Sequence, residues 1–178
     1  MASRTATKTV LAQKAEGLQV GDKAPDFSLA SDDSGKISRA SLKGRAYVVY
    51  LYPKDDTSGC TREAVDFSAA ARKFETLGVF VLGISKDSLE SHEKFRRNHK
   101  LKVTLGSDPD IKAAEAWGVW GEKTLYGRKY MGIERATFLV DAKGKIAAAW
   151  RKVKVPGHVA AVLEAAKNVR KSPLPAAN

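Results

Sequence analysis

The sequence has only one cysteine, Cys60, among its 178 residues. One thiol cannot close a disulfide within the chain, and it cannot supply a multi-thiolate zinc site. The lack of a Cys-x-x-Cys motif also excludes an oxidoreductase that uses two thiols of one chain. Because a lone cysteine is often a small buried hydrophobic residue without chemical consequence, its neighbours have to decide its role.

Long apolar runs are also missing. No stretch approaches the roughly 20 residues that cross a bilayer, and the first residues, MASRTATKTV, have no secretory hydrophobic core. We therefore expect no membrane association and a location in the reducing cytoplasm. Import into an organelle, directed by a leader that is poor in acidic residues, is the less favoured alternative.

Acidic residues are few relative to basic ones. The chain has 31 Lys and Arg against 20 Asp and Glu, which gives a formal net charge of +11. Such an excess favours non-specific attraction to nucleic acid. However, the eight basic residues between positions 143 and 171 lie in an expected strand and an amphipathic helix, where charges usually mark a solvated face. We expect no specific nucleic-acid site.

No internal repeat, low-complexity tract or change of composition divides the chain, so its length predicts one domain. We expect this domain to cover residues 17–170. Residues 1–16 show no clear periodicity and predict a flexible leader. Two prolines follow the last predicted helix, so we expect a flexible tail over residues 171–178.

The apolar pattern predicts alternating strands and helices. Residues 46–52 (AYVVYLY) carry no charge and indicate a central strand covered on both faces. Apolar residues at helical spacing then predict a helix over residues 58–77, and residues 79–84 supply a second strand parallel to the first. The other predicted elements are helices over residues 89–98 and 109–117, the latter with Asp108 as N-cap, a hairpin of residues 136–140 and 145–150, and a last helix that packs through Val159, Val162, Leu163, Ala166 and Val169. This order predicts an α/β, thioredoxin-like fold with a mixed central sheet and helices on both faces.

Reactive groups concentrate where the first strand meets the first long helix, in YPKDDTSGCTRE (residues 52–63). Cys60 falls in the first helical turn, where free N–H groups and the helix dipole favour a thiolate and should lower the pKa of the thiol below about 8.5. Gly59 lets the backbone approach a ligand closely, and Pro53 fixes the loop. Thr57 adds a hydroxyl group. These features favour a reactive cysteine over an inert one.

The spacing of Pro53, Thr57 and Cys60 resembles the active site of the peroxiredoxins, in which Pro, three residues, Thr or Ser and two residues precede the reactive Cys. Together with GDKAPDFSL (residues 21–29) and GVWGEKTLYGRKYMGIERATFLVD (residues 118–141), this pattern is similar to the branch known as bacterioferritin comigratory protein or Q-type peroxiredoxins. The resemblance covers about residues 17–170, which is the whole predicted domain. It implies a thiol-dependent peroxidase that reduces hydrogen peroxide and organic hydroperoxides without a metal or other cofactor.

Carried over residue by residue, the resemblance implies that Cys60 attacks the peroxide and becomes a sulfenic acid. Thr57 would bind the peroxide oxygen, Arg135 in GIERATF would support both thiolate and peroxide, and Glu63 looks like the acidic partner that orients the arginine. Amide groups of Gly59 and Cys60 would help to stabilise the charge on the leaving oxygen. Each residue also has a simpler interpretation: Thr57 as a helix cap, Glu63 as a first-turn acid and Arg135 as a surface charge.

The sequence departs from this family pattern because it has no resolving cysteine. Many Q-type members carry one five residues after the first, where this chain has Val65, and others carry it on the next long helix, where Phe95 and Arg96 stand. The resemblance therefore implies a one-cysteine mechanism in which an external thiol, from thioredoxin, glutaredoxin or a small molecule, reduces the sulfenate. It also favours a monomer, with a dimer as the alternative.

Other functions stay open at this point. A catalytically inactive thioredoxin-like module would use its basic surface to bind nucleic acid or acidic proteins. A Cys/His hydrolase would need His92, His99 or His158 beside the thiol. Residues 117–130 mix aromatic and basic side chains that could stack on bases, although we expect these rings to close a long loop over the mouth of the pocket.

Overall fold

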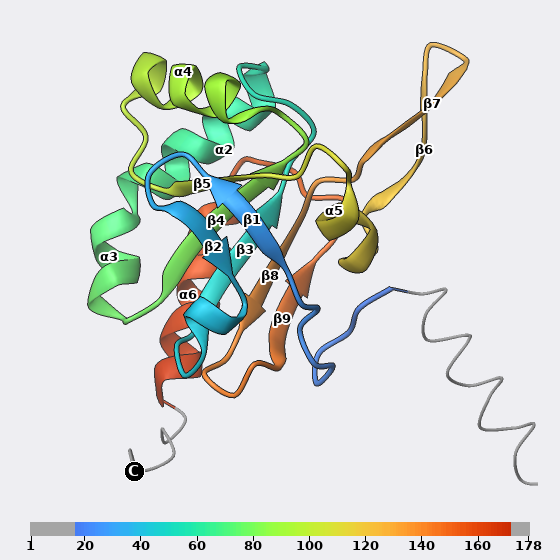
Figure 1. The fold of residues 1–178 in the computed structure, drawn as a ribbon. Coiled ribbons are helices and arrows are strands. Elements are labelled where there is room, and N and C mark those ends of the chain that lie inside the picture. Colours follow the sequence, from blue (N-terminus) through green and yellow to red (C-terminus); the bar gives the residue numbers. More distant parts are fainter. Residues whose placement is uncertain (1–16, 172–178) are drawn as a thin grey trace, which may run out of the picture.

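A mixed β-sheet runs through the centre of the computed structural model, which describes residues 17–171 (Figure 1). Strand β3 (Tyr47–Leu51) pairs in parallel with β4 (Phe80–Ser85), and β4 pairs in parallel with β5 (Thr104–Ser107). The other strands pair antiparallel: β1 (Ser28–Ser31), β2 (Gly35–Ser38), β8 (Ala136–Val140) and β9 (Ile146–Trp150). The seven strands lie in the order β2-β1-β5-β4-β3-β8-β9, so the mixed sheet that the sequence predicts is confirmed.

Strand β3 is buried along its whole length because its side chains alternate between two hydrophobic cores. Tyr47, Val49 and Leu51 lie in one core, and Val48 and Tyr50 lie in the other. Helices cover both faces, as predicted. The face of Val48 packs against α2 (Ser58–Ala69), α3 (Ala71–Thr76), α4 (Leu89–His99) and α6 (His158–Lys171), and the face of Val49 packs against α5 (Lys112–Ala116) and the 3-10 helix η1 (Ala40–Leu42).

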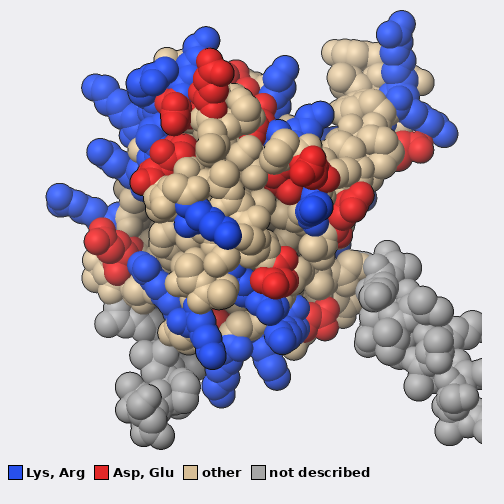
Figure 2. Space-filling view, in the orientation of Figure 1, with Lys and Arg blue, Asp and Glu red and all other residues tan. Residues whose placement is uncertain are grey.

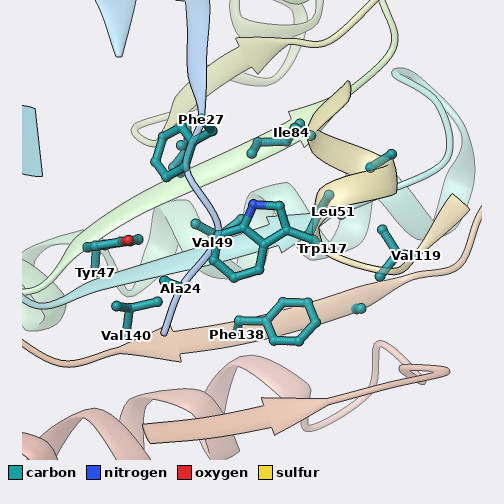
Figure 3. Close-up of a cluster of buried hydrophobic side chains, with 14 of the residues drawn as sticks. Ala24, Phe27, Tyr47, Val49, Leu51, Ile84, Trp117, Val119, Phe138 and Val140 are labelled. Atoms are coloured by element: carbon teal, nitrogen blue, oxygen red, sulfur yellow. The ribbon is translucent and has the colours of Figure 1, made fainter. Parts of the chain in front are cut away.

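The core on the Val49 face is organised around Trp117. Figure 3 shows its indole between the rings of Phe27 and Phe138, with centroid distances of 6.4 and 5.0 Å. These aromatic contacts stabilise the sheet beyond the burial of their area. Trp117 therefore serves the core, and it lies on the opposite face of the sheet from Cys60.

The long helix predicted over residues 58–77 is two helices. Ala70, with φ −92° and ψ 1°, separates α2 from α3. The rings of Phe67 and Phe74 still meet across the break, at a centroid distance of 6.0 Å. Because the apolar spacing continues through the break, periodicity alone predicted one helix.

Helix α5 is also shorter than predicted, beginning at Lys112. Its N-cap position is Ile111, which has a φ of 55°, and not Asp108. The carboxylate of Asp108 nevertheless accepts hydrogen bonds from the amides of Ala113 and Ala114, at 3.1 and 2.9 Å. The acid thus stabilises the first turn from the preceding loop, which explains why the sequence pattern placed the helix start too early.

Residues 120–133 form a β-hairpin that projects from the body of the protein, and not the predicted loop over the pocket (Figure 1). Strand β6 (Trp120–Leu125) pairs antiparallel with β7 (Arg128–Ile133). The turn residues Tyr126 and Gly127 have φ of 51° and 76°, the conformation that a two-residue hairpin turn requires. Tyr126 is 97% exposed, so this ring does not cover a pocket.

The sequence analysis did not predict β1, β2, β5 or η1, but the other predicted elements agree with the structure. Strands β3 and β4, helix α4 and the hairpin of β8 and β9 lie within two residues of their expected bounds. Helix α6 buries four of the five apolar residues expected on its packing face, namely Val159, Val162, Leu163 and Ala166.

The described residues test only part of the predicted domain layout. The expected leader, residues 1–16, lies outside them. The expected tail does so too, except for Lys171, which ends α6. Within residues 17–171, no helix is long and apolar enough to cross a membrane.

A close backbone approach in β4 gives a testable prediction. A Cβ at Gly83 would lie 2.6 Å from Cζ of Tyr50, whose ring is fully buried and stacks on Phe67 at a centroid distance of 4.5 Å. Gly83→Ala should therefore lower the free energy of unfolding by about 1–3 kcal/mol in urea denaturation. Gly121→Ala is the matched control, because nothing lies within 4 Å of its added Cβ. Equal stability of the two variants would contradict this packing.

Candidate active site

Cys60 lies at the start of helix α2, which follows strand β3 after the loop of residues 52–57. Cys60 is the third residue of α2, after the extended N-cap residue Thr57. Its side chain packs in the core on the Val48 face and is only 1% exposed. Cys60 is thus a free thiol at a helix N-terminus, enclosed by apolar side chains.

Arg135 contacts the cysteine from the segment between β7 and β8. Its Nη2 donates a hydrogen bond to Sγ of Cys60 at 3.3 Å, and its Nη1 donates to Oε1 of Glu63 at 2.9 Å. Glu63 lies three residues after Cys60, so both side chains are on the same face of α2. The structure therefore brings together three of the residues that the sequence analysis selected.

The carboxylate of Glu63 is fully buried, and its Oε2 has no hydrogen-bond partner among the described residues. Burial raises the pKa of Glu63 to about 7, although the charge of Arg135 opposes this shift. Burial lowers the pKa of Arg135, but Glu63 and Cys60 outweigh this effect and raise it overall. Arg135 therefore remains a cation beside the thiol.

Gly59 makes room for the guanidinium group. A Cβ at this position would lie 3.1 Å from Nη2 of Arg135. A larger residue would push the arginine away from Sγ of Cys60, which the same nitrogen contacts. The lack of a side chain at Gly59 therefore leaves space for Arg135. The sequence analysis had explained this glycine by close approach of its backbone to a ligand.

Thr57 is the N-cap residue of α2 by position, but its side chain does not cap the helix. Its hydroxyl donates to the carbonyl oxygen of Lys54 at 2.9 Å. The interpretation of Thr57 as a side-chain cap is therefore wrong. Pro53 is half-buried in the same loop, and within the described residues no hydrogen bond joins Thr57 to Cys60.

Arg135 also affects the pKa of His158, which is buried. Burial, and then the charge of Arg135, lower its pKa to about 4. Its Nε2 and the hydroxyl of Thr137 are 2.7 Å apart. Within residues 17–171, no histidine forms a hydrogen bond with Cys60, so the geometry gives the Cys/His hydrolase no support.

The positions at which the family resemblance suggested a resolving cysteine have other uses here. Val65 lies on α2 and is 41% exposed, whereas Phe95 is fully buried. Arg96 forms an ion pair with Asp32 and donates to the carbonyl oxygen of Leu101 at 2.7 Å. These residues contribute packing and hydrogen bonds in place of a second thiol.

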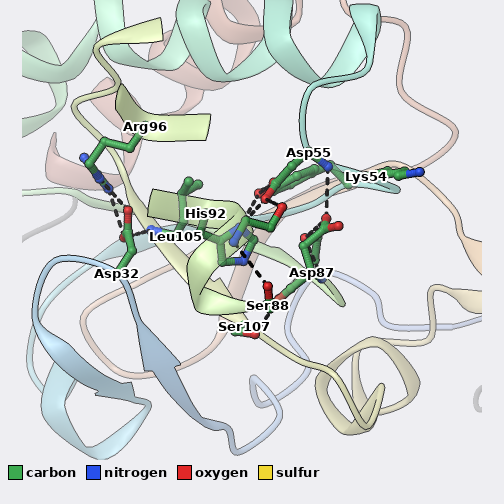
Figure 4. Close-up of polar contacts among 12 residues, drawn as sticks. Asp32, Lys54, Asp55, Asp87, Ser88, His92, Arg96, Leu105 and Ser107 are labelled. Atoms are coloured by element: carbon green, nitrogen blue, oxygen red, sulfur yellow. Dashed lines mark hydrogen bonds and ion pairs between the residues drawn. The ribbon is translucent and has the colours of Figure 1, made fainter. Parts of the chain in front are cut away.

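The sequence analysis did not single out Asp55 or His92 as a pair, although they lie beside the active-site loop. The carboxylate of Asp55 and Nδ1 of His92 are 2.7 Å apart, and both side chains are buried (Figure 4). They are separated by 37 positions in the chain. In the sequence, the only hints of this contact are the two consecutive acids of the loop and a histidine in the helix predicted over residues 89–98.

Basic side chains do not form a continuous stripe on the face in view. Figure 2 shows Lys and Arg scattered over it with Asp and Glu among them. The tip of the projecting hairpin carries Arg128 and Lys129, and Lys129 pairs with Glu122 at 3.5 Å. This face gives no specific support for a groove that follows a nucleic-acid backbone.

Comparisons with known proteins agree with the site. The sequence profile of the AhpC/TSA family matches residues 20–149. The curated "Putative peroxiredoxin bcp" of Coxiella burnetii is 49% identical over 146 residues, which cover 82% of this chain and 97% of that protein. "Peroxiredoxin Bcp" of Bacillus subtilis is 44% identical over 152 residues, 85% of this chain and 97% of that one. A structure of Xanthomonas campestris bacterioferritin comigratory protein, studied for its alkyl peroxide reduction activity, superposes with a TM-score of 0.78 and 38% identity over 86% of this chain and 98% of that chain.

The opposite pKa shifts of Glu63 and His158 predict how stability depends on pH. With its pKa raised from 4.5 to about 7, Glu63 binds more protons in the folded state, so its contribution to stability falls as pH rises between these values. With its pKa lowered from 6.5 to about 4, His158 makes a contribution that rises with pH between those values. The two contributions largely cancel in the wild type.

In Glu63→Gln, the contribution of His158 to the pH dependence of stability should no longer be offset. Between pH 7 and pH 4, denaturant titrations should show the variant losing on the order of 3 kcal/mol more stability than the wild type. The double variant with His158→Gln should recover the shallow dependence of the wild type. Parallel pH profiles for Glu63→Gln and the wild type would rule out the raised pKa of Glu63.

Proposed function

Because this chain belongs to the AhpC/TSA family, and within it to the Bcp or Q-type peroxiredoxins, it is a thiol-dependent peroxidase, and we propose that Cys60 is its peroxidatic nucleophile. The observation that carries this assignment is the 3.3 Å contact between Nη2 of Arg135 and Sγ of Cys60. Cys60 is the single thiol of the chain, so all of the redox chemistry has to pass through it. Organic hydroperoxides and hydrogen peroxide are the substrates that we assign to it.

The first step oxidises the cysteine and reduces the peroxide. The thiolate of Cys60 attacks the terminal oxygen, a sulfur–oxygen bond forms and the oxygen–oxygen bond breaks. The enzyme then carries a sulfenic acid, and the leaving group departs as an alkoxide or hydroxide that takes up a proton. Arg135 sits where it stabilises the thiolate before attack and the negative charge that moves across the peroxide during it.

Thr57 and the first turn of α2 would orient the peroxide. The hydroxyl of Thr57 donates its proton to the carbonyl oxygen of Lys54, so its oxygen is left to accept the O–H of the substrate. Its side chain leaves the helix N-terminus uncapped. The amides of Gly59 and Cys60 have no partners within the helix and can donate to the peroxide oxygens.

Regeneration requires a thiol from outside the chain. A first thiol attacks the sulfenic acid, which forms a mixed disulfide with Cys60 and releases water. A second thiol attacks this disulfide, which restores Cys60 and releases the oxidised reductant. We propose thioredoxin, glutaredoxin or a small thiol as that reductant, a monomeric enzyme, and the reducing cytoplasm as its location.

Single-turnover kinetics test the proposal. Reduced protein mixed with hydrogen peroxide should form a sulfenic acid that a dimedone probe traps at Cys60, and Cys60→Ser should not react. Arg135→Lys should slow the second-order reaction about 100-fold or more, because lysine cannot hold Glu63 and Sγ at once.

Arg151→Lys is the matched control. Arg151 pairs with Glu134 at 3.0 Å and forms no hydrogen bond with Cys60, so its replacement should change the rate less than about two-fold. A wild-type protein that reacts no faster than free cysteine would instead support the inactive basic binding module.

A further inference from the structure

A cavity of about 570 Å³ lies where β3 begins, at the opposite end of this strand from the loop that leads to Cys60. Its walls come from the segment before β1, from η1 and the residues that follow it, and from the turn between β8 and β9. Figure 1 shows η1 and this turn at one end of the molecule and α4 at the other. Cavities of this size hold small organic molecules.

Basic side chains outnumber acidic ones around the cavity, and Figure 2 shows several Lys and Arg side chains close together over this lower end of the molecule. Two acids, Asp26 and Asp141, line the cavity, and both have partners. Asp26 lies 3.7 Å from Nε of Arg39, and Oδ1 of Asp141 accepts a hydrogen bond from the amide of Lys145 at 3.0 Å. The five basic residues of the lining are Lys23, Arg39, Lys43, Arg45 and Lys143. Five cations against two acids leave an excess of three positive charges, which favours an anionic ligand.

The inner wall of the cavity carries a polar atom without a partner. Tyr47 lines the cavity and is only 2% exposed, and its hydroxyl has no hydrogen-bond partner among the described residues. Its ring is fixed in the core of Figure 3, edge-on to Phe27 at a centroid distance of 6.2 Å. Because a buried polar group without a partner is costly, this hydroxyl marks a place where a ligand oxygen would be stabilised.

The hydroxyl of Tyr47 is suited to an anion. Burial raises its pKa to about 12, although the charge of Arg39 opposes this shift. The phenol therefore keeps its proton at neutral pH and can donate a hydrogen bond. Arg39 is held beside the cavity, since its Nη1 donates to the carbonyl oxygen of Ala24 at 2.8 Å. A phosphate group offers the acceptor oxygens that such a donor and such a cation require.

We propose that this cavity binds a small organic molecule that carries two phosphate groups, with the cations of the rim on the phosphates and the hydroxyl of Tyr47 as a hydrogen-bond donor. A terminal phosphate carries about two negative charges at neutral pH, so two phosphates balance the positive excess, whereas a single carboxylate leaves most of it. The side chains of Ala40, Leu42 and Ala142 supply apolar surface for the carbon framework. Within residues 17–171, none of the lining residues forms a hydrogen bond with Cys60, so this site is separate from the peroxidase chemistry.

Nuclear magnetic resonance titrations of the isotope-labelled, reduced protein test the site. ADP and fructose 1,6-bisphosphate are the probes, because one has adjacent phosphates and an aromatic base and the other has separated phosphates on a sugar. At physiological ionic strength, at least one of them should shift the amide resonances of residues 39–47 and 141–145 along a saturable curve. Inorganic phosphate should bind at least about tenfold more weakly, because it lacks the second phosphate and the carbon framework.

Two substitutions remove different parts of the site. Tyr47→Phe keeps the ring in the core but deletes the hydroxyl, and it should weaken binding of the tighter probe about tenfold. Lys143→Gln removes one exposed charge of the rim, without touching the core, and should weaken it about two- to five-fold. Lys94→Gln is the matched control, because Lys94 is exposed on α4 and does not line the cavity. Its replacement should leave the affinity unchanged.

Failure of both probes to shift these amides would overturn the proposal. So would wild-type affinity in both Tyr47→Phe and Lys143→Gln, or an equal loss in Lys143→Gln and Lys94→Gln, because that result would mean general attraction between charges. Cys60→Ser should bind the probes as the wild type does, and a changed affinity would contradict the separation of the two sites. A protein that binds the probes but forms no sulfenic acid would refute the proposed function alone.

Discussion

The ion pair between Glu63 and Arg135 is the constraint on which the rest of the site depends. A fully buried carboxylate is costly unless a cation compensates it, and removing one member of such a pair typically costs several kcal/mol. Arg135 is therefore fixed by Glu63, which forms no hydrogen bond with Cys60. The same guanidinium then has one nitrogen left to face Cys60, and Gly59 supplies the space it needs. The ion pair thus fixes the positive charge of Arg135 beside Cys60 and the direction from which the guanidinium approaches the thiol.

The fold supplies this pair from two distant parts of the chain. Strand β3 is buried on both faces, so its packing holds in place the point from which the active-site loop and α2 begin. Strand β8 pairs with β3 from Ala136 onward and thereby brings Arg135 to the start of α2. The same packing leaves the side chain of Cys60 almost without contact with solvent.

The long apolar patterns predicted the central strands, the face of α6 and the position of Cys60 in the first turn of a helix. They do not show the break at Ala70, since the apolar spacing runs through it. Tyr126–Gly127 is not one of the Asn-Gly or Asp-Gly pairs that signal a two-residue hairpin turn. Short edge strands such as β1 and β2 carry few apolar residues and gave no signal. Within the site, family resemblance selected Glu63 and Arg135. The contact of Asp55 with His92 depends on how α4 packs, which no local pattern encodes.

A double-mutant cycle on the rate of peroxide reduction tests the central claim most directly. The account requires Glu63 to act only through Arg135. Glu63→Gln should slow the reaction of the wild type with hydrogen peroxide, but it should have no further effect when Arg135 is already replaced by Met. Equal slowing by Glu63→Gln in both backgrounds would show that Glu63 acts on Cys60 or the peroxide independently, and it would contradict the account.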